Sequence, residues 1–134
     1  FIIKGILEPE DAVKALDVGA DAIIVSNHGG RQLDQTSSTI SMLPKIVEAV
    51  KGKSAIWLDG GIRSGQDILK AVALGADNTL IGRAMSYGLA ANGISGCEKT
   101  LNILHTELDM TMALCGHKNL KEVDDSILKI ESDF

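Results

Sequence analysis

The sequence predicts an α/β fold in which strands alternate with helices and the strands form a parallel sheet. Apolar runs at residues 22–25 and 79–81 are each followed by a stretch with apolar residues at helical spacing, which is the pattern of strand–helix units. Both runs are apolar at nearly every position, as is typical of parallel strands buried on both faces. This alternation argues against an all-helical or an all-antiparallel fold.

The first half of the chain contains two of these units. A predicted strand at residues 1–4 precedes a helix that opens at Pro9, because proline is favoured in the first turn of a helix. The apolar residues of this helix are expected on one buried face: Ala12, Val13, Ala15 and Leu16. The second strand, residues 22–25, leads through a long loop into a helix over residues 39–50, which Gly52 is expected to end.

The second half contains two more units and then a helical tail. A third strand at residues 55–58 is followed by a helix that Ser64 caps, and a fourth strand covers residues 78–81. Helical segments are then predicted at 84–91 and 95–114, joined at glycines. One apolar face of the tail is expected to pack on the rest of the molecule: Leu101, Leu104, Leu108 and Met112.

Composition places the chain among globular proteins and argues against two kinds of partner. Hydrophobic residues make up 45% of the sequence, enough for a sizeable core. The net charge is −5 and only four residues are aromatic, so we expect no nucleic-acid partner. No apolar run approaches the length of a bilayer span, and we expect no membrane span.

The two cysteines, Cys97 and Cys115, belong to no Cys-x-x-Cys pair. We expect both to be reduced thiols in the core of a cytoplasmic protein. Peripheral association with a membrane is the alternative location.

The most informative segment is residues 26–31, Ser-Asn-His-Gly-Gly-Arg, which directly follows a predicted strand. Histidine changes protonation closer to neutral pH than other side chains, so His28 can act as a general base. Arg31 offers a planar group that binds a carboxylate through two parallel hydrogen bonds. Gly29 and Gly30 lack a Cβ and let a flat ligand approach the backbone. A glycine turn with two solvated polar side chains is the plainer interpretation.

Two further glycine turns follow the third and fourth predicted strands. Residues 59–63 are Asp-Gly-Gly-Ile-Arg, and residues 82–83 are Gly-Arg. Glycines at such turns leave backbone N–H groups free for a phosphate, and Arg83 adds a full positive charge. We therefore expect a phosphate site here. For Asp59, a carboxylate that stabilises a helix start is the alternative to cofactor contact.

Taken in order, these segments resemble the C-terminal half of the FMN-dependent α-hydroxy acid dehydrogenases and oxidases, the family of L-lactate dehydrogenase, lactate oxidase and glycolate oxidase. The matching segments are residues 3–6, 26–34, 59–65, 74–77 and 81–83. The His-Gly-Gly-Arg segment is the most specific of them, whereas the other glycine turns occur in several phosphate-binding barrels. The resemblance implies an FMN enzyme that oxidises an L-2-hydroxy acid, L-lactate foremost, to the 2-oxo acid.

The resemblance also implies a role for each site residue. His28 is the base and Arg31 binds the substrate carboxylate. Lys4 lies beside the flavin ring, where a cation stabilises the reduced form, and Ser26 contacts the flavin. The remaining cofactor-binding residues hold the ribityl chain and phosphate of FMN: Asp59, Gly60, Gly61, Arg63, Gly82 and Arg83. No metal ligand is predicted, and His105 and His117 are expected at the surface.

The implied fold is the C-terminal half of a TIM (β/α)8 barrel, namely its last four βα units and the C-terminal helices. A complete barrel needs about 250 residues, whereas this chain has 134. Residues 1–134 are therefore assigned as half of one barrel domain. We expect an incomplete fragment that is inactive alone, because the family's other half supplies two substrate-site tyrosines and the aspartate that orients the histidine.

The chain departs from the family pattern at two places. Residues 35–38, Gln-Thr-Ser-Ser, stand where the family has a glycine and a proline-containing stretch, and Ser64 stands where a second basic residue is frequent. Neither departure removes a group assigned to the chemistry.

Two other functions are weighed against this one. The chain could be a catalytically inactive half-barrel that survives as a remnant or structural module. It could also be a barrel enzyme of the inosine monophosphate dehydrogenase type, although the chain has no counterpart of the cysteine loop on which that enzyme relies. Expected partners are a small 2-hydroxy acid and either further copies in a full-length homo-oligomer or an N-terminal half-barrel complement.

Overall fold

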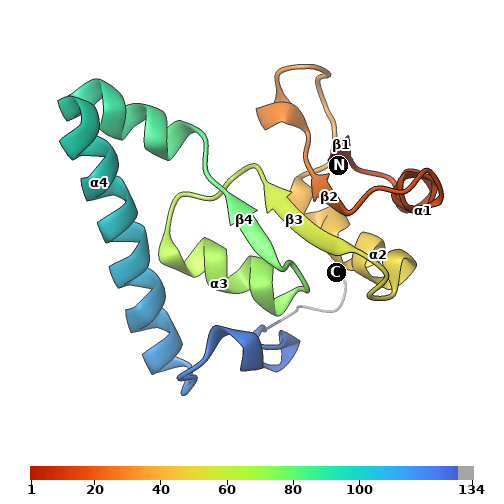
Figure 1. Cartoon of the computed structure of the whole chain (residues 1–134). Coiled ribbons are helices and arrows are strands. Elements are labelled where there is room, and N and C mark those ends of the chain that lie inside the picture. The colour runs from red at the N-terminus through yellow and green to blue at the C-terminus, as the bar shows by residue number, and fades with distance from the viewer. Residues whose placement is uncertain (130–134) are drawn as a thin grey trace.

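The computed structural model describes residues 1–129 and contains a wholly parallel sheet of four strands in the order β1-β2-β3-β4 (Figure 1). The strands are β1 (Ile2–Ile6), β2 (Ala22–Val25), β3 (Ala55–Asp59) and β4 (Asn78–Leu80). The predicted α/β class with a parallel sheet is confirmed. Because the strands are parallel, the loops that follow them lie along one edge of the sheet, where ligands of α/β folds bind.

A helix follows each strand: α1 (Pro9–Asp17), α2 (Thr39–Val50), α3 (Gly65–Ala73) and α4 (Arg83–Leu114). Within residues 1–129, three 3-10 turns lie at His28–Gly30, Leu120–Glu122 and Asp125–Ile127. The predicted helix starts are confirmed. Pro9 occupies the first turn of α1, and the Ser38 hydroxyl accepts a hydrogen bond from the Ser41 amide. Ser64 and Asp67 cap α3 reciprocally, the arrangement known as a capping box.

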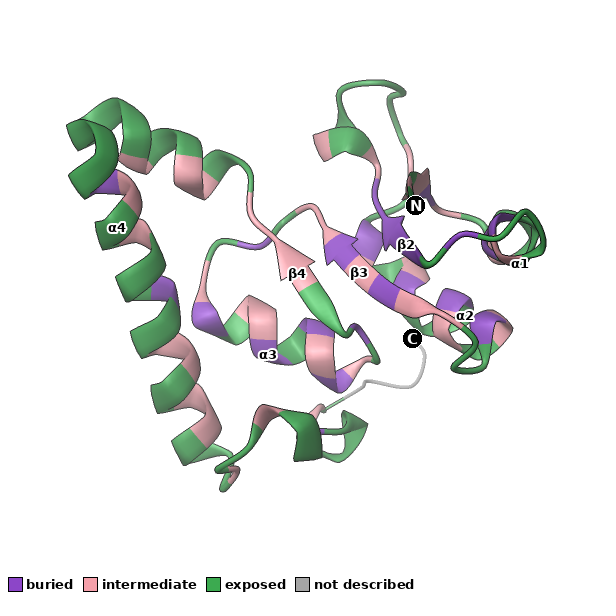
Figure 2. Cartoon of the chain, in the orientation of Figure 1, coloured by how far each residue is buried: buried purple, intermediate pink, exposed green. Residues whose placement is uncertain are grey.

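The main core lies between one face of the sheet and the helices α1 and α2. Alternate residues of β2 and β3 supply its sheet side, and small and aliphatic residues of the two helices supply the other. Its fully buried large side chains include Ile23, Val25, Leu43, Ile46 and Leu58. In Figure 2 the buried residues gather on β2, β3, α2 and α3, whereas α4 is mostly exposed. The core thus fixes the positions of the strands, and the polar loops follow the ends of these strands.

A second, smaller cluster fixes α4 against α3. Leu69 and Ala73 of α3 are buried together with Val123, and Leu108 and Met112 of α4 pack against them. The two helices approach closely at Gly65, where any Cβ would collide with the α4 backbone at Leu108. The Glu107 carboxylate accepts a hydrogen bond of 2.9 Å from the Gly65 amide. Glu107 therefore helps to cap α3 from another helix.

Several local expectations are corrected by the structure. Val13 of α1 is 40% exposed, so it lies outside the buried face formed by Ala12 and Ala15. Helix α2 ends at Val50, and the residue that caps it is Lys51, with a positive φ of 52°, rather than Gly52. Strand β1 extends to Ile6, so Lys4 lies within it and not at its end. Gly5, with φ of 101°, produces a register shift there.

The last helix and the cysteines also differ from expectation. The predicted joint at Gly93 is confirmed, because α4 breaks at Asn92 and Gly93, which have non-helical backbone angles. Gly88 and Gly96, which the sequence also predicts as joints, instead let the two helical segments touch, since a Cβ on either would collide with the other segment. Neither cysteine belongs to the core. Cys97 lies within α4 and is half-buried, whereas Cys115 follows the last residue of α4 and is exposed.

Strand β4 is only partly buried, although its sequence predicts burial on both faces. Thr79 and Leu80 are half-buried and Asn78 is exposed. Within residues 1–129, β4 is an edge strand with one neighbour, β3, and this edge position accounts for its exposure. No helix in this part of the chain is long and apolar enough to cross a membrane.

Candidate functional site

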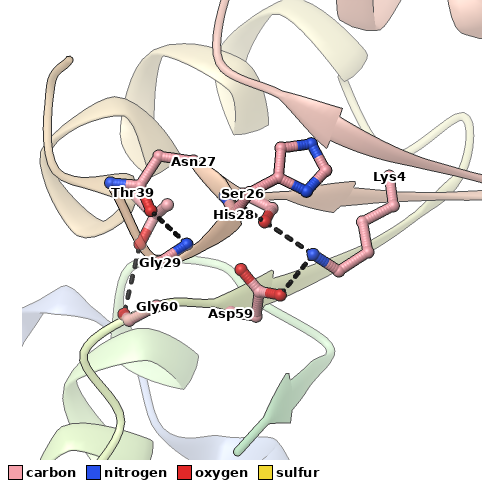
Figure 3. Close-up of polar contacts among 8 residues, drawn as sticks. All are labelled: Lys4, Ser26, Asn27, His28, Gly29, Thr39, Asp59 and Gly60. Carbon is pink, nitrogen blue, oxygen red and sulfur yellow. Dashed lines mark hydrogen bonds and ion pairs between the residues drawn. The ribbon is translucent and has the colours of Figure 1, made fainter. Parts of the chain in front are cut away.

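The buried hydroxyl of Ser26 anchors the polar cluster at the end of β2. Ser26 is fully buried, and its Oγ accepts hydrogen bonds from the Lys4 Nζ at 2.7 Å and from the His28 amide at 3.1 Å (Figure 3). A buried hydroxyl is costly unless it is hydrogen-bonded, and these donors satisfy it. Ser26 therefore ties β1 to the first turn of the loop that carries His28.

Lys4 bridges two strands through its ammonium group. Its Nζ lies 2.5 Å from Oδ2 of Asp59, the last residue of β3. The other carboxylate oxygen of Asp59, Oδ1, is buried and has no hydrogen-bond partner in the described part of the chain. A buried acceptor without a donor costs about 1–3 kcal/mol. Asp59 is thus suited to accept a hydrogen bond from a ligand hydroxyl.

The backbone turn after β2 places the imidazole of His28 over strand β1. His28, Gly29 and Gly30 all have positive φ, of 55°, 73° and 71°. The His28 Nε2 lies against Gly5, where an added Cβ would come within 2.7 Å of it. Gly5 was missed by the sequence reasoning, although a glycine inside a strand pattern is a known sign of close approach or a bulge.

Asn27 closes the loop between β2 and α2. Its Oδ1 accepts a hydrogen bond of 3.1 Å from the Gly29 amide, and its Nδ2 donates one of 3.3 Å to the Ser37 carbonyl. These bonds give the turn at His28 a defined shape even though His28 itself is exposed. Asn27 received no role from the sequence.

The loops after β3 and β4 form an end of the site that is suited to anions. Gly60 and Gly61 have φ of 93° and 85°, and no atom of residues 1–129 lies within 4 Å of the space that a Cβ on Gly61 or Gly82 would occupy. In the part of the chain that the structure describes, no side chain caps the start of α4, in contrast to α2 and α3. Its first amides and the guanidinium of Arg83 are therefore available to a negatively charged group.

All of the predicted site residues except Ser26 line one cavity of about 1000 Å³. They come from β1 and from the ends of β2, β3 and β4 with the segments that follow them: Lys4, His28, Arg31, Asp59, Gly60, Gly61, Arg63, Gly82 and Arg83. Ser26 lies beneath the cavity wall and acts through Lys4 and His28. Four of the lining side chains are cationic and one is a carboxylate, so the cavity favours an anion although the chain as a whole carries a net charge of −5.

A second cavity, of about 400 Å³, lies between α3, β4 and α4 and is mainly apolar. It contains none of the predicted site residues. His105 borders it and is exposed, and His117 is half-buried. The polar, cationic cavity at the strand ends is therefore the candidate site.

The residues present fit a flavin mononucleotide. The anion end offers arginines and free amides to a phosphate, and the orphaned Asp59 Oδ1 offers an acceptor to a sugar-like hydroxyl. The cation of Lys4 and the glycine-lined floor suit a flat ring that gains negative charge. These features extend from the loop after β4 to the face of β1.

Comparison with known proteins identifies the family to which these features correspond. A profile of the family described as FMN-dependent dehydrogenase matches residues 1–130. Among curated proteins, the chain is 47% identical over 133 residues to the peroxisomal (S)-2-hydroxyacid oxidase GLO3 of Arabidopsis thaliana, covering 99% of this chain and 37% of that protein. It is 49% identical over 130 residues to the L-lactate oxidase of Nostoc sp., covering 97% and 36%.

Solved structures give the same result. The chain superimposes on a crystal structure of mandelate oxidase with benzoyl-formic acid with a TM-score of 0.86 and 50% sequence identity, covering 89% of this chain and 36% of that one. A second crystal structure, of mandelate oxidase with (S)-2-phenylpropionate, matches with a TM-score of 0.87. The chain thus spans little more than a third of the length of these relatives.

Proposed function

The chain belongs to the family of FMN-dependent dehydrogenases, and from this we propose that its cavity binds FMN and supplies the base and the carboxylate clamp for oxidising an L-2-hydroxy acid. The proposed substrate is L-lactate and the product is the 2-oxo acid. The observation that supports this most strongly is the convergence of His28, Arg31 and the two glycine turns on one cationic cavity.

The phosphate of FMN is assigned to the loops after β3 and β4. Gly60, Gly61 and Gly82 bring backbone close to it, and Arg63 and Arg83 neutralise its charge. Asp59 accepts from a ribityl hydroxyl through its unpaired oxygen. FMN, when bound, supplies the ring that accepts the electrons of the oxidation.

The protein's own groups handle the substrate's proton and carboxylate. Arg31 binds the carboxylate through its planar guanidinium, and His28 takes the proton that leaves the substrate. Both side chains line the cavity and are exposed to solvent. A base works best in a site from which water is excluded, so we propose that turnover requires further βα units to cover this face, as in an eight-stranded barrel.

The binding test compares FMN with riboflavin, which has the same ring and ribityl chain but no phosphate. Titration of the 134-residue chain, followed by flavin fluorescence, is expected to give clearly tighter binding for FMN, and inorganic phosphate should compete with it. Equal affinity for the two flavins, or no binding of either, would contradict the proposed site.

The chemical test uses a chimera in which this chain follows the N-terminal remainder of the Nostoc L-lactate oxidase. We expect dye reduction with L-lactate and not with D-lactate. His28→Gln should abolish turnover, because no base remains, while FMN stays bound. An FMN-loaded chimera that folds but shows no lactate-dependent reduction would favour the alternative of a catalytically inactive half-barrel.

A further inference from the structure

Thr39 is a buried polar residue to which the proposed function gives no role. Among residues 1–129, only Ser26 and Thr39 are buried polar side chains, with Thr39 2% exposed. Ser26 already serves the site through Lys4 and His28. Thr39 is the first residue of α2, at the end of the long loop that carries His28. Burial of a hydroxyl at this place needs a compensating hydrogen bond.

The hydrogen bond crosses from one site loop to another. The Thr39 Oγ1 lies 3.2 Å from the carbonyl oxygen of Gly60, and because a carbonyl can only accept, the hydroxyl donates (Figure 3). Both the hydroxyl and the methyl group of Thr39 pack closely against Gly60. A Cβ on Gly60 would lie 3.0 Å from the Thr39 Oγ1 and 3.3 Å from its Cγ2.

This bond fixes the direction of the next amide. The carbonyl of Gly60 and the N–H of Gly61 belong to one planar peptide unit, and no cis peptide bond occurs in the described chain. In a trans peptide these two groups point in opposite directions. With the carbonyl directed to buried Thr39, the Gly61 N–H is directed away from the core, on the side of the cavity that Gly61 lines.

Without such a bond this peptide would be unusually free to rotate. Gly60 and Gly61 both have positive φ, and glycine visits this region and its mirror image at similar cost. The Gly61 N–H has no acceptor within the described residues, so the amide itself does not hold the peptide in place. The Thr39 hydroxyl is the side-chain group that does.

We propose that Thr39 is a positioning residue that orients the Gly60–Gly61 peptide so that the Gly61 amide donates to the phosphate of the bound cofactor. This inference rests on the proposed function. Thr39 acts through the backbone and touches neither substrate nor cofactor.

The test uses the isotopically labelled 134-residue chain, with inorganic phosphate and FMN as probes. In Thr39→Val, which keeps the shape and loses the hydroxyl, the Gly60 carbonyl carbon signal should shift upfield. The phosphate-induced shift of the Gly61 amide should be lost, and the phosphate and FMN dissociation constants should rise about threefold to tenfold, as for one net hydrogen bond.

Two variants keep the hydroxyl bond and serve as controls. Thr39→Ser retains the donor and should stay within about twofold of wild type. Ser41→Ala removes a hydroxyl from the same turn of α2. Among the described residues that hydroxyl bonds only to Ser38, so the variant should leave the Gly60 and Gly61 signals unchanged. If Thr39→Val does not fold, Thr39→Ala provides a second variant without the hydroxyl. A purely structural role would change the unfolding midpoint without changing the Gly61 response.

The outcomes separate this inference from the proposed function. If the wild-type chain responds to phosphate at Gly61 and the variants without the hydroxyl respond equally, Thr39 has no positioning role and the FMN site stands. If wild type shows no phosphate response and binds no FMN, the proposed function fails and the role of Thr39 fails with it. Loss of the response in Thr39→Val together with its retention in Thr39→Ser supports the proposal.

Discussion

The Nη2 of Arg83 donates a hydrogen bond of 2.9 Å to the carbonyl oxygen of Gly29, a residue 54 positions earlier in the chain. This bond joins the start of α4 to the turn that carries His28. Arg83 also lines the anion end of the cavity. One guanidinium therefore connects the proposed phosphate site with the proposed catalytic loop.

Arg83→Lys is expected to weaken both functions of this side chain. A lysine keeps the charge but cannot donate in two fixed directions. We expect the FMN dissociation constant to rise about tenfold or more, since hydrogen bonds between charged groups are worth roughly 1.5–3 kcal/mol. Hydrogen exchange at residues 28–31 should become faster. The control is Lys45→Gln, which removes an exposed charge from α2 outside the cavity. An unchanged FMN affinity in Arg83→Lys would contradict the assignment.

Gly5→Ala should displace the imidazole of His28. The new Cβ would lie 2.7 Å from the His28 Nε2, and the backbone φ of 101° is strained for alanine. The backbone strain alone costs about 1–3 kcal/mol. The matched control is Gly19→Ala, which has a similar φ of 86° but open space around the Cβ. Urea unfolding should show destabilisation in both variants, whereas the imidazole NMR signals of His28 should move only in Gly5→Ala.

Asp59→Asn tests the carboxylate between Lys4 and the cavity. The ion pair with Lys4 is partly exposed, so its loss should change the free energy of unfolding by less than about 1 kcal/mol. FMN binding should weaken measurably, because the amide offers a poorer acceptor to a ligand hydroxyl. Asp11→Asn removes a similar carboxylate that pairs with Lys14 on α1 and should leave FMN affinity unchanged. Equal effects of the two substitutions on FMN affinity would refute the role of Asp59.

Gly65→Ala should loosen α4 from α3. The added methyl group would collide with the backbone of α4 at Leu108 and with Glu107. Overpacking of this kind costs about 1–3 kcal/mol, to be measured by urea unfolding, and the Gly65 amide should lose its bond to the Glu107 carboxylate. Gln66→Ala changes the neighbouring exposed residue and should have little effect. A Gly65→Ala variant as stable as wild type would show that the two helices are not in close contact in solution.

The 134-residue chain alone is expected not to oxidise L-lactate. Within residues 1–129, β1 and β4 each have one unpaired edge, and His28 and Arg31 are exposed to water. Open parallel edges also favour association with another chain. The measurement is L-lactate-dependent dye reduction with added FMN, run beside the chimera with the Nostoc N-terminal remainder. Turnover by the unfused, monomeric chain would show that the expectation of an incomplete enzyme is wrong.

The sequence by itself determined the strand–helix order, the helix starts near Pro9, Thr39 and Ser64, and the loops that carry the site. These features depend on neighbouring residues: apolar spacing, proline geometry and short capping side chains act over a few positions. For the same reason, the segment containing His28 and Arg31 is recognisable from its residue types and from the apolar run that precedes it.

The tertiary structure decided which of these groups meet, and it corrected several expectations drawn from the sequence. The bonds from Lys4 to Asp59, from Arg83 to Gly29 and from Thr39 to Gly60 each join different βα units, so they depend on strand register and helix packing, which sequence spacing does not encode. The exposure of β4 follows from its place at the edge of the sheet, not from its apolar residues. Local chemistry therefore marked the site residues, whereas three-dimensional packing determined their partners.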